Sequence, residues 1–196
     1  MKLLLYCTKA KPRLMISCKG EYKLEQDFEI ITDKAIVFNG KIIAECDYEV
    51  EHIWCELFLR ETPYGMKPEY KYYTETSDDI TKESCLTYEQ MDNYLEKKDI
   101  NYAIHIKNLH IFDEPKELSD YYETKDMHSN EDHNWYNFGY HYIDTAPKNM
   151  RLVSDKDNGN GNNFIMISIK PDELCRVLNG EQTIIVRKKV LKEMIK

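Results

Sequence analysis

Hydrophobic and polar residues alternate most regularly near the end of the chain, in the segment Phe164–Lys188. Isoleucines at every second position of Ile165–Ile169 predict a strand with one buried face. Pro171 suits the first position of a helix, where its missing N–H costs nothing, and apolar residues at helical spacing follow it. Asn179-Gly180 ends that helix, since both residues enter the left-handed conformation easily. Thr183–Val186 then predicts a second, β-branched strand.

The first third of the chain and the segment after residue 100 also favour β-structure. Residues 1–60 contain several β-prone runs, and Asn39-Gly40 is a hairpin signal between two of them. Residues 101–112 predict a further strand. Between these regions Thr87 begins a short helix through a capping box. The chain as a whole is therefore expected to be an α+β protein.

Two segments interrupt this pattern. Residues 61–84 are polar and contain two prolines and a glycine, so we expect a long loop there. An irregular insertion is expected around 120–145, with one helical turn before it. We therefore predict a single domain over residues 1–196, with insertions around 61–84 and 120–145 and a C-terminal strand–helix–strand unit at 164–189.

Composition places the chain among globular proteins and excludes several classes. The formal net charge of −8 over 196 residues argues against broad binding of a phosphate backbone. No apolar run approaches the length of a membrane span, and no signal-peptide cleavage pattern follows the first residues. None of the six cysteines belongs to a C-x-x-C pair. We therefore expect free thiols in a reducing cytoplasm, with no cofactor and no metal site.

Charge is distributed unevenly along the chain. Residues 61–96 and 113–132 are acidic, whereas both ends of the chain are basic. The basic residues near the two ends are Lys9, Lys11, Arg13, Lys19, Arg187, Lys188, Lys189, Lys192 and Lys196. If the termini are neighbours, these side chains form one local basic patch; the alternative is that they only solvate the surface.

The C-terminal pattern resembles the opening of ASCH domains, which belong to the PUA-like β-barrel superfamily. That family begins with a short strand, a helix started by proline and a turn of the form G-x-K-x-x-E-x-R. Gly180 and Arg187 match this turn, whereas Gln182 and Ile185 replace the family Lys and Glu. The resemblance implies a PUA-like barrel with two or three short helices.

The order of the segments resembles that of a circularly permuted ASCH domain. Lys2–Lys9 resembles the family's next strand, and Lys41–Ile53 and Tyr102–Ile111 resemble later ones. Permutation is tolerable because the termini of a closed barrel lie close together. It requires the strand Leu3–Cys7 to pair in one sheet with Thr183–Val186. The permuted order is similar to that of proteins of bacteriophages and prophages.

A cleft for a nucleotide or an RNA base is what this resemblance implies. Its binding residues would be basic and polar groups at strand ends, with one aromatic ring for stacking. The expected ligand-binding residues are Arg187, Lys188, Lys170, Lys9, Thr8, Tyr6 and Gln182. Arg187 is the leading candidate among these residues because it matches the family motif. The leading function is therefore non-catalytic binding of a nucleotide or RNA element.

An enzyme is one alternative. The superfamily includes a small amidohydrolase that acts on N4-acetylcytidine, and resemblance to it would place a catalytic lysine at Gln182 and a threonine nucleophile at Ile185. Glutamine cannot accept a proton near neutral pH, and isoleucine has no hydroxyl. No catalytic residue is therefore predicted, and an amidohydrolase-like enzyme would have to use different groups.

A protein inhibitor is the other alternative. Aromatic residues near acids in the insertions would mimic nucleic acid and occupy a basic groove on a protein partner. They are Tyr70, Tyr72, Tyr73, Tyr121, Tyr122, Trp135, Tyr136, Phe138, Tyr140 and Tyr142. The chain would then be an acidic, phage-type inhibitor of a host nucleic-acid-binding or defence enzyme; otherwise these rings only pack against the barrel. His128, His133 and His141 lie in the same region without a recognised metal spacing.

Overall fold

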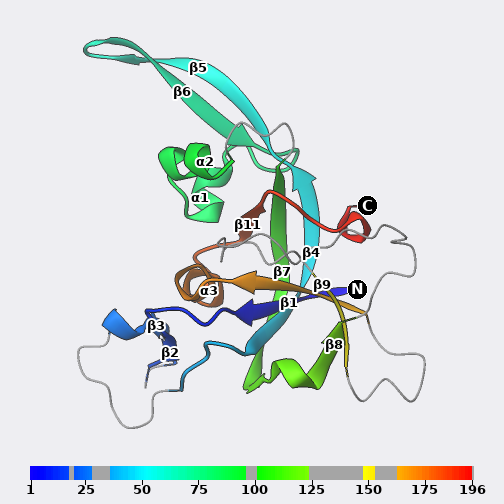
Figure 1. Cartoon of the computed structure of the whole chain (residues 1–196). Helices are drawn as coiled ribbons and strands as arrows, with labels where there is room; N and C mark the ends of the chain where they lie inside the picture. The colour runs from blue at the N-terminus through cyan, green and yellow to red at the C-terminus, as the bar shows by residue number, and fades with distance from the viewer. Residues whose placement is uncertain (18–19, 28–35, 96–100, 124–147, 153–162, 196) are drawn as a thin grey trace, which may run out of the picture. The chain divides into compact units, whose positions relative to one another are not determined.

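Long β-strands dominate the computed structural model, which describes residues 1–17, 20–27, 36–95, 101–123, 148–152 and 163–195 (Figure 1). The chain forms two compact units. The first comprises Met1–Asp47 and Asn108–Asn179, and the second comprises Tyr48–Lys107 and Gly180–Lys196. Strands β4 (Ile42–His52) and β7 (Tyr102–Lys116) contribute residues to both units. The expectation of a single domain over the whole chain stays a prediction.

The centre of the first unit is strand β1 (Lys2–Cys7), which is hydrogen-bonded on both edges. It pairs in parallel with β10 (Phe164–Ile169) and antiparallel with β4. Strand β9 (Lys148–Leu152) continues the sheet beside β10, and β8 (Tyr121–Glu123) pairs with β9. Alternation in β10 predicted one buried face, but both faces are buried, as is usual for strands of a parallel pair.

Helix α3 (Pro171–Leu178) follows β10 directly and buries its apolar face. Its proline stands in the first turn, and the chain leaves the helix through Asn179 and Gly180, whose φ of 76° is left-handed, so the predicted boundaries are confirmed. The helix packs against a small ribbon of β2 (Leu14–Ile16) and β3 (Tyr22–Leu24). The 3-10 turns η1 (Glu25–Asp27) and η2 (Leu118–Asp120) complete the unit, and η2 confirms the helical turn expected there.

The predicted turn at Asn39-Gly40 joins three segments of the first unit. Lys41 N–H donates to the Phe38 carbonyl across the turn, and Gly40 has a φ of 87°. The Asn39 side chain accepts from Leu14 N–H at 2.8 Å and donates to the Ala10 carbonyl at 2.8 Å. Gly40 N–H donates to the carbonyl of Cys7 at the end of β1. One asparagine therefore holds the chain that leaves β1 against the start of β4.

The second unit contains two short helices and a hydrophobic cluster. Strand β11 (Ile184–Arg187) pairs antiparallel with β7. Helices α1 (Ile80–Ser84) and α2 (Tyr88–Leu95) follow the hairpin formed by β5 (Trp54–Thr62) and β6 (Gly65–Tyr73), and the 3-10 turn η4 (Lys192–Met194) lies near the C-terminus. The cluster consists of Ile53, Tyr72, Ile80, Met91, Leu95, Ala103, Ile184 and Val186.

The capping box predicted for α2 is present. Gln90 N–H donates to the Thr87 hydroxyl at 3.2 Å, and Thr87 N–H donates to the Gln90 side chain at 2.9 Å. These two bonds satisfy backbone donors that the helix itself cannot.

The α+β class is confirmed, but the closed barrel is wrong. The strands follow the order β11-β7-β4-β1-β10-β9-β8, and no pairing within the described residues joins β11 to β8. Strands β1 and β11 belong to one seven-stranded sheet, as predicted, but the predicted direct pairing of Leu3–Cys7 with Thr183–Val186 is wrong. A strand has only two edges, and those of β1 are taken by β10 and β4. It is the other strand of the C-terminal unit, β10, that lies against β1.

The long loop expected at residues 61–84 is wrong as well. Those residues contain the end of β5, all of β6 and helix α1. Prolines and charged residues suggested a loop, but they occupy a turn and an exposed ribbon, where both are compatible with β-structure.

Replacing Asn39 with Ala is expected to lower the free energy of unfolding by about 1–3 kcal/mol, because Leu14 N–H and the Ala10 carbonyl each lose a partner. Urea denaturation followed by circular dichroism measures the change. Gln26→Ala, at an exposed position in η1, is the control and is expected to change stability by less than about 0.5 kcal/mol. Equal stability of both variants would show that the Asn39 bonds do not hold this turn.

Candidate functional site

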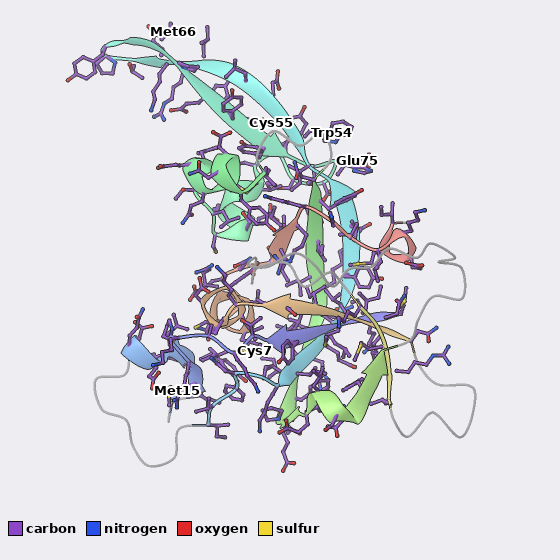
Figure 2. All side chains as sticks on the ribbon, viewed as in Figure 1. Cys7, Met15, Trp54, Cys55, Met66 and Glu75 are labelled. Carbon is purple, nitrogen blue, oxygen red and sulfur yellow. The ribbon has the colours of Figure 1, made fainter. Side chains whose placement is uncertain are left out.

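The most exposed apolar surface in the described chain lies on the β5–β6 hairpin. The hairpin extends past α1 and α2, and Met66 lies toward its tip, with Trp54 and Cys55 at its base (Figures 1 and 2). The exposed fraction is 56% for Leu57, 61% for Leu59 and 60% for Met66. Exposed apolar residues scattered singly need no explanation, but contiguous ones mark interaction surfaces.

A two-residue turn closes the hairpin. Thr62 and Gly65 form its last pair, with Pro63 and Tyr64 between them. The Thr62 hydroxyl donates to the Gly65 carbonyl at 2.6 Å, and Gly65 has a φ of 113°, which a residue with a side chain rarely adopts. Local sequence therefore determines where the chain reverses.

The register of the two strands separates their side chains into two different faces. Residues directly opposite each other in an antiparallel pair project to the same face. The first face, here called the apolar face, carries the pairs Cys55–Tyr72, Leu57–Tyr70, Leu59–Pro68 and Glu61–Met66. The second, here called the charged face, carries the pairs Trp54–Tyr73, Glu56–Lys71, Phe58–Glu69 and Arg60–Lys67. Arg60 also contacts Glu69 on that face at 3.5 Å.

Tyr72 connects the apolar face to the hydrophobic cluster of the second unit. It is only 3% exposed and packs in the cluster that includes Met91 and Leu95 of α2. Its hydroxyl donates to the Asp92 carboxylate at 3.2 Å. Burial raises the pKa of Tyr72 above its usual value. The apolar face is therefore covered by α2 near the base and uncovered toward the tip.

A polar cluster holds the turn that follows β6. Glu51, at the end of β4, accepts hydrogen bonds from the Thr76 hydroxyl at 2.9 Å and from Thr76 N–H at 3.3 Å, and it lies 3.2 Å from His105 Nε2. Burial would raise the pKa of Glu51, but hydrogen bonds from Thr74 and Thr76 and the nearby His105 together lower it. The Ser77 hydroxyl donates to Glu83 at 2.6 Å. The cluster ties the hairpin base to β7 and α1.

The hairpin carries no excess of acid. Its acidic residues are Glu56, Glu61 and Glu69, and its basic residues are Arg60, Lys67 and Lys71. Of the tyrosines proposed for a nucleic-acid mimic, Tyr70 is 41% exposed and Tyr72 is buried. An ordered row of carboxylates is therefore missing from this segment. Trp135, Tyr136, Phe138, Tyr140 and Tyr142 lie outside the described residues.

Four of the predicted ligand-binding residues, Tyr6, Thr8, Lys9 and Lys170, belong to the first unit. Because β1 and β10 are parallel and in register, Thr8 and Lys170 directly follow neighbouring strands at the same edge of the sheet. Tyr6, within β1, packs instead against a hydrophobic cluster that includes Leu4 and Phe164. Lys9 packs its side chain near Gly40, where an added Cβ would meet Lys9 Cε at 2.7 Å.

The other three predicted ligand-binding residues belong to the second unit. Gln182 is 3% exposed and donates to the Ile184 carbonyl at 2.9 Å. Arg187 donates to the Val186 carbonyl at 2.8 Å, and Lys188 Nζ lies 5.0 Å from the centre of the Tyr94 ring. Neither unit by itself contains the whole set, and its role in ligand binding stays a prediction. Ile185, where a nucleophile would be needed, is fully buried.

No metal-binding group of three or more His, Cys, Asp or Glu residues occurs in the described ranges. His128, His133 and His141 lie outside those ranges. Cys7 and Cys46 are free, buried thiols, and burial raises the pKa of each to about 12, which makes them unreactive near neutral pH. The helices described here include none long and apolar enough to cross a membrane.

Comparisons with known proteins do not assign a family. No family model matches the chain, and comparison with curated proteins and with solved structures found no similar protein. The site is therefore interpreted from its own geometry.

Sequence reasoning missed the hairpin as a functional element. The available signal is the short apolar run Leu57–Leu59 between Glu56 and Arg60, which is compatible with a strand. Its partner strand, Gly65–Tyr73, lies in the polar segment 61–84, whose prolines and glycine favour a loop when it is considered alone.

Glu51→Gln is expected to lower the free energy of unfolding by about 1–2 kcal/mol near neutral pH, because hydrogen bonds to a carboxylate are stronger than those to an amide. The lowered pKa of Glu51 stabilises the fold above the pKa of an unfolded glutamate, and this contribution disappears as pH falls through the folded pKa. The difference in stability between wild type and variant should therefore shrink as the pH falls below about 4.3, the pKa of an unfolded glutamate, and disappear below the folded pKa of Glu51.

Chemical denaturation at several pH values measures this difference. Glu49→Gln is the matched control, because the Glu49 side chain is 51% exposed in its ion pair with Lys107. If the difference in the free energy of unfolding between wild type and Glu51→Gln stays constant with pH, Glu51 does not stabilise the fold through a lowered pKa.

Proposed function

We propose that this protein is a binding protein that recognises a protein partner through the apolar face of its β5–β6 hairpin. The single observation that carries the proposal is the uncovered row of apolar side chains on that face, which begins at the buried Tyr72 and ends at the exposed Met66. A partner that covers the row would extend the hydrophobic cluster already present at the hairpin base.

Burial of the exposed hairpin residues by a partner would be energetically favourable. A two-stranded hairpin is marginally stable in water by itself and normally needs a further strand or a packed face. Full burial of a leucine stabilises by about 1.5–3 kcal/mol relative to exposure. Leu57 and Leu59 are both more than half exposed, so much of this free energy is unused in the free chain. Association costs offset part of it.

This proposal retains a protein partner, as in the inhibitor alternative, but it changes the kind of surface expected on that partner. Balanced charge on the hairpin favours an apolar groove or strand on the partner over a basic, nucleic-acid-binding groove. Aromatic and aliphatic anchors dominate binding energy at interfaces, and charged pairs around them contribute mainly to specificity.

Leu57→Thr with Leu59→Thr is expected to abolish partner binding while the fold is retained, because threonine keeps β-propensity and removes apolar surface. The matched control is Glu69→Thr with Lys71→Thr, which also leaves net charge unchanged and alters only the charged face. Affinity capture with wild type and both variants, followed by hydrogen exchange on the purified complex, measures the effect.

Support for the proposal requires a protein that wild type and the control both retain and the leucine variant loses, with new protection of amides in residues 55–61. Equal retention by all three chains, or protection elsewhere only, would contradict it.

A second candidate function is binding of a small anionic ligand such as a nucleotide, as the ASCH resemblance implies. The observation that favours it is that Thr8 and Lys170 directly follow two neighbouring parallel strands at the same edge of the sheet. Ligands of open α/β sheets bind at the carboxyl ends of such strands.

Lys170→Ala is expected to weaken nucleotide binding by about 1–3 kcal/mol, the range for a charge-assisted hydrogen bond. Isothermal titration with a panel of nucleotides measures it, and Lys67→Ala on the hairpin is the control for loss of one positive charge. Absence of binding to any nucleotide by wild type would eliminate this candidate without affecting the first.

A further inference from the structure

The outer edge of β5 is a second unused surface of the hairpin, distinct from its apolar face. Strand β5 pairs with β6 on one side, and within the described residues no strand pairs with its other side. An unpaired edge exposes a row of backbone N–H and C=O groups that another strand can extend.

Proline makes the two edges of the hairpin unequal. Pro68 has no N–H, so it is compatible with β6 only where its nitrogen faces away from β5. The outer edge of β6 therefore lacks a donor in its middle. By alternation along the ladder, the N–H and C=O groups of Leu57, Leu59 and Glu61 also face outward, on the β5 side. Only the β5 edge offers a continuous set of donors and acceptors.

We propose that β5 pairs antiparallel with β5 of a second copy of this chain, with the two-fold axis at Phe58. In this register Leu57 lies opposite Leu59 of the other copy, and the outward-facing backbone groups of these residues meet. Two hairpins then form a four-stranded sheet of order β6-β5-β5-β6. The inference uses an edge rather than the apolar face, so it goes beyond the proposed function and can fail independently of it.

Charge complementarity selects this register. On the charged face, the axis at Phe58 places Glu56 of each copy opposite Arg60 of the other. An axis at Leu57 would place Glu56 opposite Phe58, and an axis at Leu59 would place Leu57 opposite Glu61. Opposite charges directly across an antiparallel pair stabilise it and like charges destabilise it. Only the axis at Phe58 pairs both charges and both leucines.

Charge and backbone hydrogen bonding also exclude pairing through the outer edge of β6. Pairing of β6 with β6 about Glu69 would place the two Glu69 carboxylates together and Lys67 opposite Lys71. It would also require the missing N–H of Pro68. A two-fold contact is self-complementary by definition, and β5 satisfies that condition where β6 does not.

Pairing also enlarges the apolar face. The row Tyr70–Leu57 of one hairpin becomes continuous with the row Leu59–Pro68 of the other, on the same side of the four-stranded sheet. Sheets of three or more strands with a hydrophobic face are stable where an isolated hairpin is marginal.

Charge reversal tests the pairing and its register. Sedimentation equilibrium of the full chain measures the dimer dissociation constant. Arg60→Glu and Glu56→Arg each create two like-charge contacts per dimer, so each should raise that constant about tenfold or more. The double variant, Glu56→Arg with Arg60→Glu, restores both contacts and should return the constant to near the wild-type value. Lys67→Glu is the control, with the same charge change on β6.

Disulfide cross-linking tests the register between the two β5 strands directly. In a Cys55→Ser background, Phe58→Cys should form a covalent dimer under mild oxidation, because residues facing each other at a non-hydrogen-bonded position have Cα atoms about 4.5 Å apart. Arg60→Cys should not, since the two copies of that residue would lie about 13 Å apart along the strands.

A wild-type chain that stays monomeric at about 0.1 mM, a double charge reversal that fails to restore dimerisation, or cross-linking at residue 60 in preference to residue 58 would overturn the proposal. Rescue by the double variant together with selective cross-linking at residue 58 would establish it. Folding of each variant is checked by circular dichroism.

Discussion

The register between β5 and β6 is the constraint on which the proposed binding surface depends. Antiparallel pairing puts opposed side chains on one face, so a single residue of slippage would exchange the two faces of one strand. In the observed register Leu57 stands opposite Tyr70 and Leu59 opposite Pro68, while every basic residue of the hairpin stays on the other face. The Thr62–Gly65 turn fixes this register at one end, and the burial of Tyr72 fixes it at the other.

Interactions at the hairpin base show how this ribbon is held. Tyr72 inserts into the hydrophobic cluster, and its hydroxyl retains a partner in Asp92. Glu51 accepts a hydrogen bond from Thr76 in the turn after β6, and it also lies beside His105 of β7. These contacts anchor the base to helices and strands of the same unit, and the distal residues remain exposed. An anchored base with uncovered apolar residues beyond it is the arrangement that supports the proposed binding of another protein.

The first unit is organised around a different principle. Strand β1 is covered on both edges and its apolar residues are fully buried, so its role is structural along most of its length. Thr8 and Lys170 directly follow β1 and β10, and they lie at the same edge of the sheet because these strands are parallel.

The sequence by itself determined the local elements of this protein. Pro171, Gly180 and the box formed by Thr87 and Gln90 specify helix ends through backbone geometry and nearby hydrogen bonds, and these positions were predicted correctly. The turn at Asn39-Gly40 was predictable for the same reason. Tertiary structure alone decided which strands pair, because the edges of β1 are chosen by competition among several apolar strands that look alike locally. It also decided that Gly65–Tyr73 is a strand. Pro68 and the flanking charges favour a loop in isolation, and only pairing with Trp54–Thr62 satisfies the backbone of both segments and divides their side chains into an apolar and a charged face.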